Sequence, residues 1–215
     1  MADRANNTVA TDASGESQTH HKPQDYSDWI ALRLTKFLRF LADSFFARRY
    51  GHRAVVLETV AAVPGMVAGM LRHMRSLRRL ENDRGWIRHL LEEAQNERMH
   101  LMIFLEIAKP TWFERMLILL AQAIFFTAFL LLYLLSSRTA HRLVAYFEEE
   151  AVISYTEYLA EIDSGKLSNK AAPEIAIEYY DLAADSCLRD VIEAVRTDEM
   201  DHRDANHEMA DTLSA

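Results

Sequence analysis

The chain has 215 residues, of which 50% are hydrophobic and 26% are charged. This length supports one sizeable hydrophobic core rather than several. The four prolines, six glycines and single cysteine exclude a collagen-like repeat, a disulfide framework and a cluster of metal-bound thiolates. Because the formal net charge is −8, the chain is also unsuited to binding nucleic acid.

The charge is unevenly distributed along the chain. Residues 1–28 carry −3, residues 29–115 carry +6 and residues 116–215 carry −11. The basic middle part has helix-like patterns rather than a groove of stacking aromatic side chains. An anionic membrane surface is therefore the more suitable partner for it.

Residues 1–28 are predicted to be a disordered polar tail, because they are rich in Asn, Ser, Thr and Asp and resemble neither a signal peptide nor a transit peptide. We expect residues 29–215 to form one domain. In residues 29–46, apolar side chains recur at helical spacing while basic ones lie on another face. Such a helix either packs on a core or lies in a membrane interface, and its pattern alone favours neither.

Two more helices are predicted at about residues 53–80 and 86–108, with a turn at 82–85 between them. Pro64 predicts a kink in the first of these. The small residues of the 65–69 stretch would let a neighbouring helix approach closely, either within the chain or across a dimer interface.

Residues 116–135 contain only two polar side chains, Gln122 and Thr127, and no charge. This length is sufficient to cross a bilayer. Helical patterns follow at about 138–162 and from 173 to about 212, with a break near Asp185. Because no stretch alternates with a period of two over the length of a strand, the sequence predicts an all-α protein.

Two ExxH tetrads carry the strongest chemical signal. Glu97 and His100 form one, and Glu199 and His202 form the other. Residues three positions apart share a helix face, so each tetrad can offer a carboxylate and an imidazole to the same ion. The alternative is that these are solvated helix faces with hydrogen-bonded histidines.

Two further carboxylates complete a familiar pattern. Glu58 lies in an otherwise uncharged run, and Glu148 begins an acidic cluster 51 positions from both Glu97 and Glu199. A carboxylate in so apolar a run must be paired or bound to a metal. The order Glu, ExxH, Glu, ExxH predicts a ferritin-like four-helix bundle with a core that binds two iron or manganese ions.

The metal site constrains the membrane topology. If residues 116–135 crossed the bilayer, Glu58 and Glu97 would lie on one side, and Glu148 and Glu199 on the other. No shared site could form. We therefore expect residues 116–135 and 29–46 to be two helices on the membrane surface, which makes the protein monotopic.

The four segments that contain these residues resemble the signature boxes of the alternative oxidases, the cyanide-insensitive quinol oxidases. The matching runs are Leu57-Glu58-Thr59, Asn96-Glu97-Arg98-Met99-His100-Leu101, Glu148-Glu149-Glu150-Ala151 and Arg196-Thr197-Asp198-Glu199-Met200-Asp201-His202. The resemblance implies two iron ions held by Glu58, Glu97, His100, Glu148, Glu199 and His202.

The resemblance also assigns roles to neighbouring residues. It implies a redox-active tyrosine at Tyr155, which lies two helical turns beyond Glu148. It implies a quinol pocket lined by Arg53, Leu57, Glu150, Ala151 and Ser154. Asn96, His141 and Asp198 are expected to orient the metal ligands through hydrogen bonds.

Some features depart from the family pattern. Tyr179 and Tyr180 stand where the family usually has a Tyr-Trp pair, and Ser154 replaces a usual threonine. Because residues 1–28 do not resemble a transit peptide, we expect a bacterial member, on the cytoplasmic face of the inner membrane. A eukaryotic member would occupy the matrix face of the mitochondrial inner membrane.

The resemblance thus implies a non-electrogenic ubiquinol oxidase that reduces O2 to water and forms a homodimer on the lipid surface. Two alternatives remain open from the residues. One is a di-iron hydroxylase of a quinone precursor, or a ferroxidase, and the other is a non-catalytic membrane-associated helical bundle.

Overall fold

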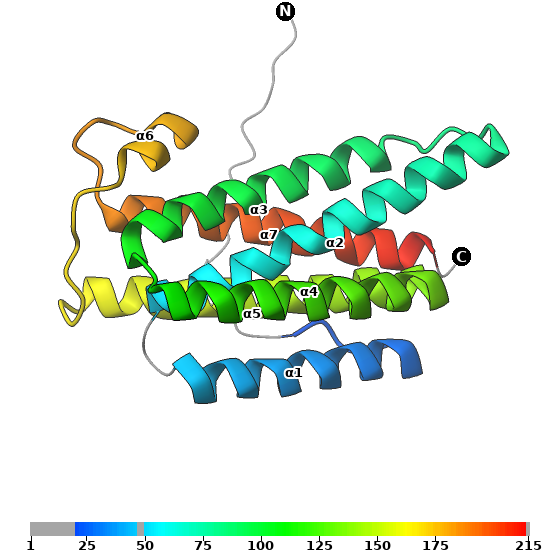
Figure 1. Cartoon of the computed structure of the whole chain (residues 1–215), viewed down its shortest axis with the longest axis horizontal. Coiled ribbons are helices and arrows are strands. Elements are labelled where there is room, and N and C mark those ends of the chain that lie inside the picture. Colours follow the sequence, from blue (N-terminus) through cyan, green and yellow to red (C-terminus); the bar gives the residue numbers. More distant parts are fainter. Residues whose placement is uncertain (1–19, 47–49, 214–215) are drawn as a thin grey trace, which may run out of the picture.

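The computed structural model describes residues 20–46 and 50–213 (Figure 1). Its helices are α1 (Tyr26–Phe46), α2 (Tyr50–Arg79), α3 (Trp86–Ala108), α4 (Trp112–Leu135), α5 (Ser137–Asp163), α6 (Glu174–Tyr180) and α7 (Leu188–Thr212). The described part of the chain contains no strand, only an isolated bridge between Ala171 and Cys187. The predicted all-α helical bundle is confirmed.

The bundle is built from two helix pairs. α2 packs along α3, and α5 packs along α7. Gly65 permits the first contact, because a Cβ at this position would lie 2.4 Å from the carbonyl oxygen of Leu90. The small residues at 65–69 therefore serve helix packing within the chain, and α2 continues as a helix through Pro64.

Two helices add an outer layer to these pairs. α1 packs on α5, and α4 packs on α2 and α5 (Figure 1). Thr111 and Glu114 form a capping box that starts α4. Ser136 ends α4 and caps α5, since its hydroxyl accepts from the Thr139 N–H at 3.2 Å. This single residue turns the chain back along the bundle.

Two helices have the length and composition of a membrane span. They cover Gly51–Arg79 and Trp112–Leu135, with mean hydropathies of 1.8 and 2.4. The sequence prediction assigned this property to residues 116–135. The other span candidate belongs to α2, which supplies Glu58 to the bundle interior.

Part of the segment predicted to be a disordered tail contacts the bundle. Residues 1–19 lie outside the described residues, whereas residues 20–28 run along α5 and enter α1. The Asp28 carboxylate is fully buried and accepts from Arg142 at 3.0 Å. The tail therefore does not extend to residue 28, because this buried ion pair fixes its last residues.

The last helical region divides into two helices. The predicted break near Asp185 falls in the loop between α6 and α7. Asp181 ends α6 in the left-handed conformation, with a φ of 51°. Because the chain breaks here, α6 packs on α3 while α7 runs in a different direction and packs along α5.

Candidate metal centre

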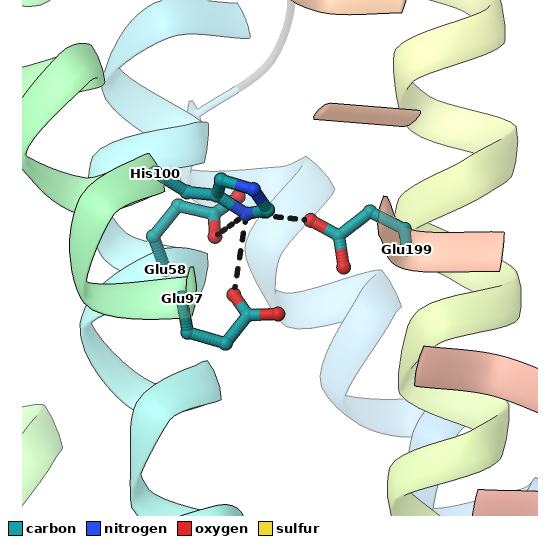
Figure 2. Close-up of side chains that lie close together, drawn as sticks. All are labelled: Glu58, Glu97, His100 and Glu199. Carbon is teal, nitrogen blue, oxygen red and sulfur yellow. Dashed lines mark ion pairs between the residues drawn. The ribbon is translucent and has the colours of Figure 1, made fainter. Parts of the chain in front are cut away.

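The structure brings the six predicted ligand residues together from four helices. Glu58 comes from α2, Glu97 and His100 from α3, Glu148 from α5, and Glu199 and His202 from α7. All six are buried. Ligand atoms of Glu58, Glu97, His100 and Glu199 all lie within 4.8 Å of one another (Figure 2).

His202 and Glu148 extend this group. Nδ1 of His202 lies 2.7 Å from Oε1 of Glu97 and 3.6 Å from Oε2 of Glu199. Glu148 is 5% exposed and is close enough to Glu199 and Glu97 for their charges to shift its pKa. The two ExxH tetrads thus face each other, and the single glutamates lie beside them.

Buried atoms of this cluster lack the hydrogen bonds that buried polar groups normally make. Both carboxylate oxygens of Glu97, one oxygen each of Glu58 and Glu199, and Nδ1 of both histidines lie in ion-pair contacts with one another, but within the described residues none of them has a partner with hydrogen-bond geometry. These atoms are oxygen and imidazole donors. Figure 2 shows Nδ1 of His100 and the carboxylates of Glu58, Glu97 and Glu199 pointing toward one another, and His202 contacts Glu97 and Glu199 of the same group. A pair of divalent or trivalent cations fits such a donor set.

The cluster has strongly shifted pKa values. Burial, together with the Glu199 and Glu97 carboxylates, raises the pKa of Glu58 and of Glu148 well above the usual value. Burial alone would lower the pKa of His202, but Glu199 and Glu97 outweigh it and raise this pKa to about 12. Without a metal, bound protons therefore reduce the negative charge of this buried cluster. A metal ion that takes their place must release them.

His100 is oriented by hydrogen bonds on its far side. Its Nε2 lies 3.1 Å from Asp198 and 2.8 Å from the Tyr180 hydroxyl, so its Nδ1 turns toward the carboxylates. Asn96 donates to the same Asp198 oxygen at 2.8 Å. Asn96 and Asp198 thus lie on the far side of His100, together with Tyr180, which the sequence had marked only as a departure from the family pattern.

A second network supports His202. His141 contacts the Asn206 side-chain oxygen at 2.9 Å, and the Asn206 amide donates to the His202 carbonyl and to Glu93. Burial lowers the pKa of His141 to about 4 and raises that of Glu93 to about 7. Sequence reasoning missed Glu93 and Asn206, although each lies one helical turn from a proposed ligand, Glu97 or His202.

Tyr155 lies directly against the carboxylates. It is 4% exposed, its ring stacks on Phe104 with centroids 5.7 Å apart, and its hydroxyl donates to Glu58. Burial and the Glu58 charge raise the pKa of Tyr155 well above its usual value. The phenol therefore keeps its proton at neutral pH.

An apolar cavity of about 630 Å³ connects the cluster with the outer layer. Glu58, Glu97, Glu148 and Glu199 line its inner end, and residues of α1 and α4 line its outer walls. Its wall includes the five residues expected to form a quinol pocket, namely Arg53, Leu57, Glu150, Ala151 and Ser154. Arg53 donates to both Ser154 and Asp43.

A helical bundle with paired carboxylate and histidine ligands on facing helices belongs to the class of di-metal carboxylate proteins. Within this class, residues 9–211 match the family model described as "Alternative oxidase". The chain belongs to the alternative oxidase family.

Named relatives agree with this assignment. The chain is 57% identical over 194 residues to "Ubiquinol oxidase, mitochondrial" of Batrachochytrium dendrobatidis, covering 90% of this chain and 61% of that one. It is 53% identical over 204 residues to "Ubiquinol oxidase 2, mitochondrial" of Arabidopsis thaliana, covering 95% and 58%. It is 55% identical over 204 residues to "Ubiquinol oxidase, mitochondrial" of Mangifera indica, covering 95% and 64%.

The chain therefore spans about three fifths of the length of these relatives. Their names place them in mitochondria of eukaryotes. The expected bacterial origin finds no support in these relatives. It rested on the composition of residues 1–28, which is a weak criterion beside identities above 50% to mitochondrial relatives.

Proposed function

We propose that this protein oxidises ubiquinol and reduces O2 to water at a pair of iron ions bound by Glu58, Glu97, His100, Glu148, Glu199 and His202. The observation that carries the proposal is the cavity, which leads from these carboxylates to a polar wall and then between two apolar helices. A quinol has the matching shape, since it joins a polar ring to a long apolar tail.

Two iron ions, when bound, supply the redox chemistry that passes four electrons from two quinols to O2. The chain itself binds and orients the quinol ring. Arg53 and Ser154 offer hydrogen bonds on the cavity wall, and the Glu150 carboxylate can accept a hydrogen bond from a quinol hydroxyl. The apolar residues around them exclude water.

Tyr155 holds a proton next to the cluster. Its hydroxyl donates to Glu58, so the phenol can give up a proton through this contact when it loses an electron. The proposed role is a transient donor of one electron during O2 reduction. Its tight contact with Phe104 keeps the ring away from solvent.

The proposal places the protein on one membrane leaflet, without proton pumping. Side chains on the outer faces of α1 and α4 are apolar and exposed, including Phe37, Phe40, Leu120 and Leu131. α4 packs along α2 and α5 and so stays with the bundle. The homologues' names favour mitochondria, and we propose the inner membrane there. We also propose a homodimer, for which the exposed methionines of α2 offer an apolar surface.

Oxygen uptake by the iron-loaded full chain tests the function. Purified protein in detergent should consume O2 with ubiquinol in the presence of cyanide, and produce water without adding oxygen to the quinone. Glu97→Gln should abolish this uptake and reduce iron content. Glu92→Gln is the matched control, because Glu92 lies on the exposed face of the same helix and pairs with Arg88. An iron-loaded protein without uptake would disprove the proposal.

A further inference from the structure

The segment that precedes α1 reaches the wall of the cavity. His20 lies between two neighbouring carboxylates of α5, with Nδ1 2.6 Å from Glu149 and Nε2 3.1 Å from Glu150. Glu150 lines the cavity, whereas His20 does not. A residue 130 positions away in sequence thus contacts a side chain of the proposed quinol site.

The geometry fixes the charge of His20. Each ring nitrogen faces a carboxylate oxygen, and carboxylate oxygens accept hydrogen bonds, so this arrangement favours protons on both nitrogens. The two carboxylates raise the pKa of His20 to about 9, against the opposing effect of burial. His20 is therefore a cation at neutral pH, placed between two largely buried anions.

Glu149 has two further partners. The His21 main-chain N–H donates at 2.8 Å, and Nε2 of His207 lies at 2.9 Å. Nδ1 of His207 faces an Arg142 guanidinium nitrogen at 2.6 Å, which can only donate. Glu149 is thus contacted from three sides, and His20 also reaches Glu150.

On its other side, Glu150 contacts the cavity network. Arg39 donates to Glu150 at 2.6 Å and to Asp43 at 2.8 Å. Asp43 in turn accepts from Arg53, which donates to Ser154. One continuous chain of charged contacts thus runs from His20 to the hydroxyl of Ser154, along the wall where a quinol ring would bind.

We propose that His20 is a positioning residue for quinol binding: it holds the Glu150 carboxylate at the cavity wall from a segment outside the four-helix bundle. The inference rests on the proposed function. Without His20, Glu150 is left to Arg39 alone and turns toward it, away from the ring position. Quinol binding then weakens, while the residues at the metal cluster stay in place.

Neutral replacements at His20 test the proposal in the iron-loaded full chain. We expect His20→Gln and His20→Asn to raise the KM for a short-chain ubiquinol about three- to tenfold, with kcat within about twofold of the unchanged protein. The Kd of the corresponding ubiquinone, measured by calorimetry, should rise by the same factor. His20→Arg keeps the charge and several donors, so it should restore the KM. Lys22→Gln, at an exposed position two residues away, is the control.

These variants are expected to fold, because other contacts hold the segment. The Tyr146 hydroxyl donates to the His21 carbonyl at 3.1 Å, and Ser27 contacts Thr139 at 2.7 Å. A double-mutant cycle separates positioning from general damage. In a Glu150→Gln background, His20→Gln should have no further effect on the Kd.

The outcomes separate the two proposals. The role of His20 would be overturned if KM and Kd were unchanged in both neutral variants. It would also be overturned if His20→Gln raised the Kd equally with and without the Glu150 carboxylate. Neither result would affect the proposed oxidase activity. An unsubstituted protein that consumes no O2 with ubiquinol would overturn the proposed function itself.

Discussion

α2 and α4 look alike in sequence and differ in the fold. Both are long and apolar enough to cross a membrane, yet 56% of the apolar stretch of α2 is buried within the bundle, against 17% of that of α4. The difference lies in what interrupts each stretch. α2 carries Glu58 into a cluster of carboxylates, whereas α4 carries the uncharged Thr127 on its exposed side.

The two helices therefore need different partners. A buried carboxylate requires a counter-charge, which a metal can provide. An exposed apolar helix face requires an apolar surface, which the bilayer provides. Hydropathy identifies both helices as unusual, but only the chemistry of the interrupting residue tells the core helix from the surface helix.

The largest expected effect comes from removing the carboxylate of α2. Glu58→Ala deletes a proposed metal ligand, so we expect oxygen uptake to fall more than about 100-fold, beyond the loss usual for residues that only support ligands. Iron content should fall with it. Thr127→Ala in α4 should change neither quantity, because this hydroxyl bonds to the carbonyl of its own helix. Full iron loading of Glu58→Ala would remove Glu58 from the ligand set.

A charge introduced into each helix separates their environments. Val67 of α2 is 1% exposed, so Val67→Asp buries an unpaired charge and should lower the free energy of unfolding by about 3–5 kcal/mol. Leu120→Asp and Leu131→Asp change side chains of α4 that are more than half exposed, and should leave chemical denaturation almost unchanged.

The same α4 variants should lose membrane affinity. Binding to vesicles of phosphatidylcholine and phosphatidylglycerol, measured by sedimentation, should weaken at least about tenfold, since each variant removes an inserted leucine. Vesicle binding equal to that of the unchanged protein would contradict a membrane-facing α4.

Close packing of α2 gives the next effect in size. Gly65→Ala places a methyl group against the Leu90 carbonyl oxygen of α3, and overpacking of this kind costs about 1–3 kcal/mol. A lower midpoint in chemical denaturation would confirm the contact. Gly51→Ala is the matched control in the same helix, because its Cβ would meet Ala108 at an ordinary 3.5 Å.

Much of this organisation could be predicted from the sequence. Residues three or four positions apart share a helix face, so local spacing revealed both ExxH tetrads, and the apolar surroundings revealed Glu58. The role expected of Tyr155 came instead from the family resemblance, because its spacing from Glu148 alone also suits a core aromatic residue. The signals for the tetrads and for Glu58 come from residues a few positions apart on the same helix, so they can be read without knowing how the helices pack.

The remaining contacts have no local signal. His20 and Glu149 are 129 positions apart, and neither belongs to a pattern that points to the other. Tyr180 reaches His100 because α6 crosses α3, a placement that depends on the loops around it. The burial of α2 and the exposure of α4 also follow from packing, which hydropathy alone does not encode.

The smallest effect concerns the attachment of the outer layer. The middle and end of α4 pack mostly through apolar side chains, whereas the segment leading into α1 is held by ion pairs and should respond to pH. The pKa of His20 is about 9 in the folded protein and 6.5 in its ordinary state. Its contribution to stability is thus fully present below about pH 6.5 and is lost as the pH rises through 9.

The raised pKa corresponds to at most about 3 kcal/mol, and solvent screening at this partly exposed site reduces the contribution to about 1 kcal/mol. Thermal denaturation of the unchanged protein and of His20→Gln should therefore differ by a few degrees at pH 6, and by almost nothing at pH 10. For Leu131→Asp, which changes an apolar side chain of α4, the difference in denaturation temperature from the unchanged protein should be the same at pH 6 and pH 10. A pH-independent difference for His20→Gln would mean that packing, rather than charge, attaches this segment to α5.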